Sequence, residues 1–384
     1  MSTVDLVELT RSAVHVLPEG ALEKKLALAR PLRVKLGIDV TAPDVTLGNG
    51  IPLQRMAAFQ RAGHIGVLIV GDYTTRIGDP SGRSAARPIL SEEEIDANAK
   101  RFVEQASTII DPERTEVRFN GEWLAKLDFA DVIRLTRTTT VAQILERDDF
   151  AKRQRGREPI SVSELLYPLM QAYDSVAVEA DVELGGTDQL YNLLAGREVM
   201  EAFGLEPQVA LTVEYLVSWD GDGMSASRGN YIGLREAPED QFGKAMRIPD
   251  ELLPQWYRLV MESDDDPLAD DPMAAKLALA RWIVARSHGQ AAARAAEEHF
   301  TLVVRERQAP DDVSQTPLPA GDPLHLPALL AEQFGLSTSE ARRLIAQGGV
   351  RVDGEPVGDL DVPREALVGA VVQAGKRRFV RFTD

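Results

Sequence analysis

The chain has 384 residues, of which 44% are hydrophobic, and a formal net charge of −17 at pH 7. This length predicts two or three domains with substantial apolar cores. The negative charge argues against a protein that coats nucleic acid nonspecifically, although one domain can still carry a basic surface. Because the chain has no cysteine, disulfides, cysteine nucleophiles and thiolate metal sites are excluded.

No apolar run approaches the roughly 18 residues that a membrane-spanning helix needs. The N-terminal residues also lack the basic start and apolar core of a signal peptide. We therefore expect a cytoplasmic protein with no membrane partner. None of the five histidines has the i, i+4 spacing of a helical zinc pair, so no protein-bound metal is expected.

The first seventy residues predict a β–α–β unit. Apolar spacing favours helices over residues 5–16 and 21–30, a strand over 33–39, and a helix from about Ile51 to Ala62 with Pro52 in its first turn. Residues 65–71 form a continuous apolar run typical of a buried parallel strand. This order predicts an α/β, Rossmann-like domain that binds ligands at the carboxyl ends of its strands.

Further helices and short strands follow to about residue 220, with a strand expected over 209–217 and charged helices over 236–305. Residues 308–323 are rich in Pro, Asp, Ser and Gly, as linkers are. We therefore expect a Rossmann-like domain over 1–232, an α-helical domain over 233–307, a linker over 308–323 and a small α+β unit over 324–384.

A glycine-rich segment, residues 70–83, follows the second strand and contains Asp79 and Arg83. Asp79-Pro-Ser-Gly is also an ordinary β-turn sequence, which explains these residues about equally well. Its place at a strand end favours a site, in which Asp79 would hold an ammonium group and Arg83 a phosphate. The spacing is not that of a Walker loop.

Tyr167, Gln171 and Asp174 lie at i, i+4 and i+7, so a helix would place all three on one face. A polar stripe of this kind is usually solvated. Here it lies among the leucines and methionine of residues 165–170, which indicates partial burial. A buried carboxylate and amide need partners, and a polar ligand could be one of them.

Five stretches together resemble the bacterial tyrosyl-tRNA synthetases that carry a C-terminal S4-type RNA-binding domain. The most specific is 166–192, which contains Leu-Tyr-Pro-Leu-Met-Gln-Ala-Tyr-Asp, ending at Asp174, and Glu-Leu-Gly-Gly-Thr-Asp-Gln, ending at Gln189. The others are residues 34–48, 71–84, 230–233 and the tail from about Leu326, so that the resemblance spans nearly the whole chain. It implies a class I synthetase fold, an S4-like RNA-binding domain and a homodimer.

The resemblance also implies site residues. Asp79, Tyr167 and Gln171 would bind the amino group of tyrosine, Asp174 would accept a hydrogen bond from its phenol, and Gln189 would line the same pocket. Such a site rejects phenylalanine because a buried polar group would be left unpaired. The positions implied around ATP, the second substrate with its Mg2+, are Gly37, Asp39, Thr41, Gly48, Gly186, Asp188 (on the ribose) and Met224.

The tail carries a basic patch that could track the phosphates of tRNA. Ser337 is a suitable helix N-cap and Gly348 a suitable C-cap. The patch comprises Arg342, Arg343, Lys376, Arg377, Arg378 and Arg381. Ordinary surface arginines on a small domain are the alternative explanation.

Both signature motifs of the family lack their reactive side chains. Thr46-Leu-Gly-Asn49 stands where the family has His-x-Gly-His, and Gly223-Met-Ser-Ala-Ser stands where it has Lys-Met-Ser-Lys-Ser. Those cations stabilise the charge that grows on the phosphates, so their loss predicts adenylate formation slower by several kcal/mol of barrier. The candidates that remain for catalysis are Thr46, Asn49, Ser225, Ser227, Arg228 and Arg83, with Arg76 and the basic segment 152–157 as further substitutes.

Three functions remain open at this point. The first is tyrosine activation and transfer to tRNA with impaired or altered phosphate chemistry. The second is a repurposed paralogue that binds tyrosine or a similar amino acid for another reaction, and the third is an inactive RNA-binding pseudo-synthetase. The retained pocket favours the first two, the stripped motifs favour the second over the first, and the S4-like tail favours a function linked to tRNA.

Overall fold

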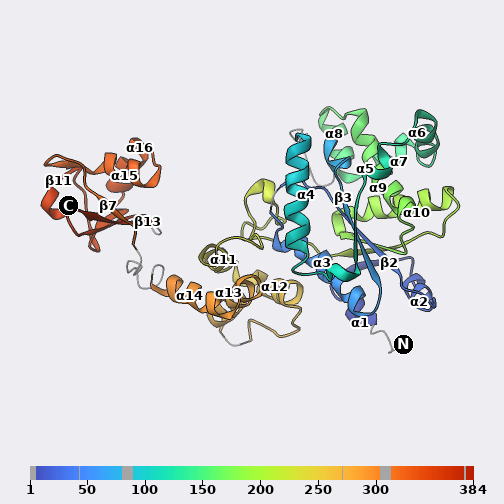
Figure 1. Ribbon diagram of the computed structural model, residues 1–384, viewed down its shortest axis with the longest axis horizontal. Coiled ribbons are helices and arrows are strands. Elements are labelled where there is room, and N and C mark those ends of the chain that lie inside the picture. Colours follow the sequence, from blue (N-terminus) through green and yellow to red (C-terminus); the bar gives the residue numbers. More distant parts are fainter. Residues whose placement is uncertain (1–5, 43, 80–89, 270, 303–312, 376–377) are drawn as a thin grey trace. The chain divides into compact units, whose positions relative to one another are not determined.

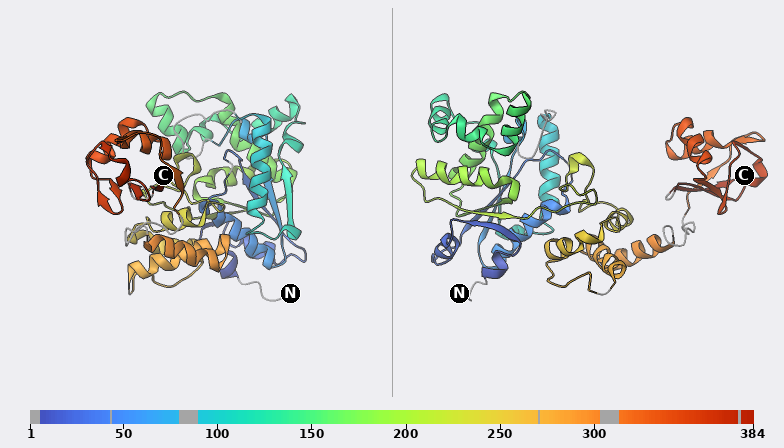
Figure 2. Two further views of the ribbon diagram at one scale, coloured as in Figure 1. Left: turned by 60° about the vertical axis from the view of Figure 1, so that its left-hand side comes forward. Right: turned by 180° about the vertical axis from the view of Figure 1, so that it is seen from behind.

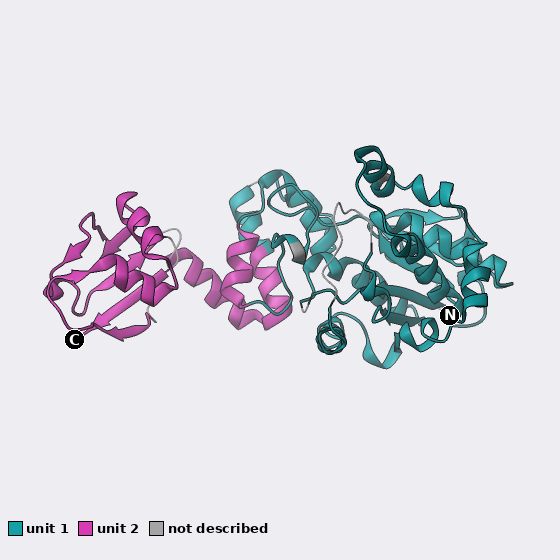
Figure 3. Cartoon of the chain, turned by 90° about the horizontal axis from the view of Figure 1, so that it is seen from above, with its two compact units in different colours: residues 1–236, 247–279 teal, residues 237–246, 280–384 magenta. Residues whose placement is uncertain are grey.

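The computed structural model describes residues 6–42, 44–79, 90–269, 271–302, 313–375 and 378–384. It divides into two compact units (Figure 3). One comprises residues 1–236 and 247–279, and the other comprises 237–246 and 280–384. Each unit is described separately below.

The first unit is built on a six-stranded sheet with strand order β1-β6-β5-β2-β3-β4. The strands are β1 (Ala13–Leu17), β2 (Arg33–Ile38), β3 (Ile65–Val70), β4 (Thr115–Phe119), β5 (Val182–Gly186) and β6 (Val209–Val213). All neighbours are parallel except β1, which runs antiparallel to β6. The chain order reverses between β2 and β5, so this is the switch point at which an open α/β sheet binds ligands.

Helices cover both faces of this sheet (Figures 1 and 2). On one face α9 (Val162–Ala177) packs against α10 (Leu190–Ala202), and α3 (Leu47–Arg61) covers the other face. The remaining helices of residues 1–236 are α1 (Leu6–Leu9), α2 (Ala21–Leu26), α4 (Glu92–Ala106), α5 (Gly121–Leu124), α6 (Phe129–Thr136), α7 (Val141–Leu145) and α8 (Asp148–Gly156). The α/β, Rossmann-like fold predicted from the sequence is thus confirmed.

Several predicted boundaries are wrong. The helix expected over 5–16 ends at Leu9. Ser12 then takes a positive φ of 61°, and β1 begins at the next residue. Pairing with β6 outweighs the apolar spacing that suggested a helix there. The next helix stops at Leu26 rather than residue 30, and β6 ends at Val213 rather than 217.

Helix α3 also begins earlier than predicted, at Leu47 rather than Ile51. Thr46 is its N-cap, so the residues expected to form a turn become the first helical turn. Pro52 therefore lies inside the helix rather than in its first turn.

The helical region that we expected over residues 236–305 contributes to both units. In the first unit, α12 (Leu253–Trp256) buries Trp256, whose indole donates to the Val217 carbonyl at 2.9 Å. In the second, α11 (Pro238–Ala245) packs on α14 (Gln290–Phe300) through the rings of Phe242 and Phe300, whose centroids are 5.5 Å apart. Helix α13 (Pro272–His288) connects the two units.

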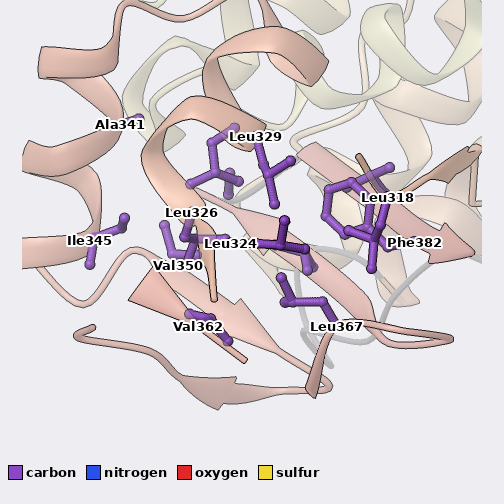
Figure 4. Packing of buried hydrophobic residues seen from close by; sticks show 14 residues of the cluster. Leu318, Leu324, Leu326, Leu329, Ala341, Ile345, Val350, Val362, Leu367 and Phe382 are labelled. Carbon is purple, nitrogen blue, oxygen red and sulfur yellow. The ribbon is translucent and has the colours of Figure 1, made fainter. Parts of the chain in front are cut away.

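The C-terminal part has its own core between a five-stranded sheet and two helices, α15 (Leu326–Phe334) and α16 (Thr338–Ala346). Figure 4 shows this core, in which Leu326, Leu330 and Val372 are fully buried. The sheet order is β10-β9-β12-β13-β7, from β7 (Gln315–Pro317), β9 (Val350–Val352), β10 (Glu355–Pro356), β12 (Val371–Ala374) and β13 (Arg378–Thr383); β8 (Leu324–His325) and β11 (Asp361–Val362) form a separate pair. Strand β7 lies in the segment that we expected to be a linker, and it pairs with β13.

A buried acid, Asp181, fixes the start of β5. Its carboxylate accepts two hydrogen bonds from Arg30, at 2.6 and 2.8 Å, and one from the backbone amide of Arg33 at 2.9 Å. The ammonium group of Lys25, also buried, lies 3.4 Å away. Although burial opposes ionisation, these donors and charges lower the pKa of Asp181 overall.

We predict that Asp181→Ala lowers the free energy of unfolding of the first unit by about 3 kcal/mol at pH 7, because it removes the buried partner of Lys25 and leaves only the exposed Glu206 beside that lysine. The loss should shrink as the pH falls from the ordinary aspartate pKa of about 3.9 through the lowered pKa of the folded carboxylate. Urea denaturation measures both effects. Asp264→Ala, which removes the exposed partner of Arg11, is the control and should leave stability unchanged; equal effects of the two substitutions would contradict the assignment.

Candidate active site

Polar side chains converge where the parallel strands end. Asp39 directly follows β2, the segment from Gly71 to Asp79 follows β3, and Asn120 follows β4. Asp188 and Gln189 lie in the short 3-10 turn after β5. Helix α9 adds Tyr167, Gln171 and Asp174, which the predicted helical spacing placed on one face.

Asp174 is a buried carboxylate with two neutral donors. The Trp123 indole donates to its Oδ1 at 2.7 Å and the Asn120 amide to its Oδ2 at 3.3 Å. Burial raises the pKa of Asp174 to about 7, although Lys35 and the two donors act in the opposite direction. At neutral pH the carboxylate is thus close to its titration midpoint, and in its ionised form it is a strong acceptor for a hydroxyl group.

Asp39 is the centre of a second group of contacts. It accepts hydrogen bonds from Thr74 at 2.8 Å and from the Tyr167 phenol at 3.0 Å. Gly71 makes this approach possible, because a Cβ there would collide with the Asp39 carboxylate and the Thr74 hydroxyl. Burial, followed by the charges of Asp39 and Asp79, raises the pKa of Tyr167, so its phenol stays protonated and donates.

The two glutamines are held by acidic partners. Gln189 donates to Asp79 at 2.7 Å and to Asp188 at 3.0 Å. Gln171 donates through its amide nitrogen to Glu183 at 3.1 Å. Its side-chain carbonyl oxygen is then the atom that can accept from a ligand, and with the surrounding carboxylates it suits an ammonium group.

The Thr46 and Asn49 side chains at the start of α3 form a closed capping box. The Thr46 hydroxyl donates to Asn49 Oδ1 at 2.9 Å, and the Asn49 amide N–H donates to the Thr46 hydroxyl at 3.2 Å. The Thr46 amide N–H also donates to Asn49 Oδ1 at 3.1 Å, while that of Leu47 donates to the Ile232 carbonyl at 2.9 Å. The hydroxyl proton of Thr46 and the backbone amides of Thr46, Leu47 and Asn49 are therefore already engaged.

The second stripped motif lies beside the first. A Cβ on Gly48 would be 3.6 Å from the Cβ of Met224, and Thr46 forms an isolated β-bridge with Gly233. Asn230 fixes the intervening loop: its side chain accepts from the Ser225 amide at 2.9 Å and donates to Asp220 at 2.9 Å. The structure thus brings Gly48 and Met224 together.

Gly223 is sterically restricted. A Cβ at this position would lie 2.9 Å from a ring carbon of Tyr215, whose side chain is half-exposed. A larger residue at 223 therefore requires the tyrosine ring to move. This contact accounts locally for glycine in the place of the family's first signature lysine.

Three of the cations proposed as substitutes pair with carboxylates in the structure. Arg228 pairs with Asp222 at 2.8 Å, and Arg76 pairs with Glu92 at 2.8 Å. Arg153, in the basic segment 152–157, is buried against Glu164. Arg83 and the side chain of Ser227 lie outside the described residues, as do Lys376 and Arg377 of the basic patch.

Sequence reasoning missed five residues of this site. They are Lys35, Thr74, Asn120, Trp123 and Glu183. Lys35 offered a signal, because it is the one charged residue in the middle of an apolar strand sequence. Nothing in the sequence linked Asn120 and Trp123 to an aspartate some fifty residues later.

Comparisons with known proteins identify the family of this chain. The family model for class I tRNA synthetases of the W and Y type matches residues 27–304, and that for the S4 domain matches 326–363. The tyrosine–tRNA ligase of Moorella thermoacetica is 49% identical over 390 residues, covering 97% of this chain and 94% of that protein. This chain belongs to the tyrosyl-tRNA synthetase family. The Geobacter sulfurreducens relative of this synthetase is 47% identical over 401 residues and covers 100% of both chains.

Solved structures support the fold of this family member. The tyrosyl-tRNA synthetase of Archaeoglobus fulgidus, solved with L-tyrosine, superposes with a TM-score of 0.62 at 22% identity and covers 76% of this chain and 98% of that one. In the described parts of the synthetase, no group of three or more His, Asp or Glu side chains could hold a metal ion. No helix in those parts is long and apolar enough to cross a membrane.

The raised pKa of Asp174 predicts a stability effect. Between pH 4 and 7 the folded protein keeps a proton that the unfolded chain releases, so stability falls as the pH rises through this window. Asp174→Asn removes this titration. Relative to wild type, its free energy of unfolding should therefore rise by about 2–4 kcal/mol between pH 4 and pH 8.

Urea denaturation at a series of pH values measures this difference. Asp181→Asn is the matched control, because the pKa of Asp181 is lowered and its titration lies below this window. Parallel pH curves for Asp174→Asn and wild type would contradict the assignment.

Proposed function

We propose that the chain is a tyrosine–tRNA ligase that activates tyrosine with ATP and transfers it to tRNA(Tyr), with a slowed adenylation step. The supporting observation is the buried Asp174 carboxylate, held by Trp123 and Asn120 at the carboxyl end of the sheet. Relatives of 49% and 47% identity are named tyrosine–tRNA ligases.

In this proposal the amino acid is held at both ends. Asp174 accepts a hydrogen bond from the phenol, so phenylalanine would leave this acceptor without its ligand partner. Asp79, the Tyr167 hydroxyl and the carbonyl oxygen of Gln171 receive the ammonium group, and Gln189 holds Asp79 in place. Asp188 contacts the ribose of ATP, close to Gly37, Asp39, Thr41 and Gly186.

The tyrosine carboxylate then attacks the α-phosphate of ATP, and pyrophosphate leaves. Negative charge grows on both phosphate groups, and a synthetase stabilises it with fixed donors and cations. Here the Thr46 proton is directed to Asn49, and Gly223 and Ala226 bring no donor from a side chain. We therefore expect Mg2+ bound with ATP to supply much of the charge neutralisation, with Asn49, Ser225, Ser227, Arg228 and Arg83 as the nearest candidates in the chain.

tRNA is the proposed partner of the S4 domain. Arg342 and Arg343 are exposed on α16, and Arg378 is exposed at the start of β13. Hydrogen bonds with Ser337, and then the charges of Arg343 and Arg378, lower the pKa of Glu340. The arginines form a local basic patch on an acidic protein, which suits phosphate contact.

We also propose a cytoplasmic homodimer. Phe129 and Ile133 are exposed apolar side chains one turn apart on α6. A second copy of the chain would remove this surface from water.

The closed capping box favours a second candidate, a repurposed paralogue that binds a tyrosine-like amino acid for another reaction. The Thr46 hydroxyl donates to Asn49, and Arg228, the cation of the loop after Gly223, pairs with Asp222. The two candidates differ in whether tyrosine supports exchange of pyrophosphate into ATP.

We predict slow but measurable tyrosine-dependent ATP–pyrophosphate exchange for the wild-type chain. Restoring the signature side chains with Thr46→His, Asn49→His, Gly223→Lys and Ala226→Lys should raise the rate by at least about 10²-fold. Tyr215→Ala should accompany Gly223→Lys to make room, and Tyr215→Ala alone is the control. If exchange stays at the blank level in the wild-type chain and in the restored variant while tyrosine still binds, the ligase hypothesis is rejected and the repurposed paralogue is left.

For the S4 domain we predict that Arg342→Glu, Arg343→Glu and Arg378→Glu together weaken tRNA binding by more than about tenfold at low salt and flatten its salt dependence. Filter binding or anisotropy at several salt concentrations measures this. Arg294→Glu, at an exposed position on α14 outside this domain, is the control for a change of charge. An unchanged affinity in the triple variant would contradict the RNA contact.

A further inference from the structure

A buried ion pair contacts helix α9 beside the proposed amino-acid site. Lys35 on β2 and Glu183 on β5 are register partners on adjacent parallel strands, at the switch point of the sheet. Their side chains are 0% and 1% exposed, and the ammonium nitrogen lies 2.9 Å from Glu183 Oε1. A buried pair of this kind contributes little net stability, because desolvating two charges offsets their attraction.

Both members of the pair reach α9. Lys35 donates to the backbone carbonyl of Gln171 at 2.8 Å and to the Ser175 hydroxyl at 2.7 Å. Glu183 Oε1 accepts from the side-chain amide of Gln171 at 3.1 Å. Glu183 Oε2 accepts from the Ser175 hydroxyl at 3.3 Å and from the side chain of Gln208. The pair therefore fixes the helix on both sides of Asp174, at residue 171 one turn before it and at residue 175 directly after it.

We propose that Lys35 and Glu183 are positioning residues that set the charge state of Asp174 and the orientation of Gln171, and thereby the preference for an amino acid with a phenolic hydroxyl. This inference rests on the proposed function, since it concerns the same amino-acid site. Neither residue touches the reacting atoms.

The two residues act on Asp174 in opposite directions. Burial is the main cause that raises the pKa of Asp174; the positive charge of Lys35 lowers it, and the negative charge of Glu183 raises it. Trp123 and Asn120 also stabilise the carboxylate as neutral donors.

Other charged or titratable groups on the elements around Asp174 include Asp39 at the end of β2, Asp72 and Asp79 after β3, Asp188 after β5 and Tyr167 on α9. Arg118 on β4 lies over the ring of Trp123 and pairs with Glu122. All of these groups remain in place in the variants below. The sign of any shift is then set by which member of the ion pair is removed.

Removing one charge from the pair should shift the pH midpoint of tyrosine binding. Lys35→Met should shift the midpoint upward by about one pH unit, because a nearby opposite charge typically lowers an acid's pKa by about 1–3 units. At pH 7 the ionised fraction of Asp174 would fall from about a half to about a tenth, which weakens tyrosine binding about fivefold. Glu183→Gln should shift the midpoint downward, and the double variant should return it toward the wild-type value.

The experiment is calorimetric titration of tyrosine and of phenylalanine into the full-length chain between pH 5.5 and 9. Tyrosine binding should show midpoints in the order Glu183→Gln, wild type, Lys35→Met, whereas phenylalanine binding should show no such order. The tyrosine-to-phenylalanine affinity ratio at pH 7 should fall in Lys35→Met. Lys25→Met removes another buried lysine, at the opposite end of β5, and is the matched control, with an unshifted midpoint.

The outcomes separate this inference from the proposed function. Midpoints that coincide, or that move in the same direction in both single variants, would overturn the positioning role while leaving tyrosine binding in place. If Lys35→Met does not fold, the near-isosteric Glu183→Gln decides alone: a downward shift of its pH midpoint for tyrosine binding supports the positioning role, and an unshifted midpoint overturns it. A wild-type chain that binds no tyrosine would overturn the proposed function itself.

Discussion

A carboxylate buried between a strand end and a helix must find hydrogen-bond donors, and the amino-acid site is organised around this requirement at Asp174. Trp123 and Asn120, in the segment after β4, donate hydrogen bonds to this carboxylate. The ion pair of Lys35 and Glu183 acts on it from the adjacent strands β2 and β5. The parallel sheet makes this possible, because its strands deliver their following residues to one edge. A ligand hydroxyl would complete the set of donors.

The two halves of the site differ in how they are built. On the side proposed for the amino acid, carboxylates and side-chain amides are fixed by hydrogen bonds to one another. On the side proposed for phosphate, Thr46 and Asn49 bond to one another and Asn230 holds the neighbouring loop. The family's charged groups are thus replaced by a closed arrangement of neutral contacts, with Tyr215 beside Gly223.

The sequence predicted the fold class, the strand-end location and the face of α9, because β–α–β order and helical spacing are local properties. It failed at Ala13–Leu17, where pairing with β6, some two hundred residues away, overrides local spacing. It also missed Trp123 and Lys35, whose importance depends on contacts that only the folded sheet creates. The capping box could not be foreseen either, since Thr46 and Asn49 were considered as separate donors rather than as partners of one another.

The central claim is that an intact tyrosine pocket is joined to a weakened phosphate site. Its most direct test is the single-turnover rate constant for adenylate formation at saturating tyrosine and ATP, measured beside the Moorella thermoacetica relative together with the dissociation constant for tyrosine. We predict dissociation constants within about tenfold of one another and a rate constant at least about 10³-fold lower for this chain. Equal rate constants, or a chain that fails to bind tyrosine, would contradict the account.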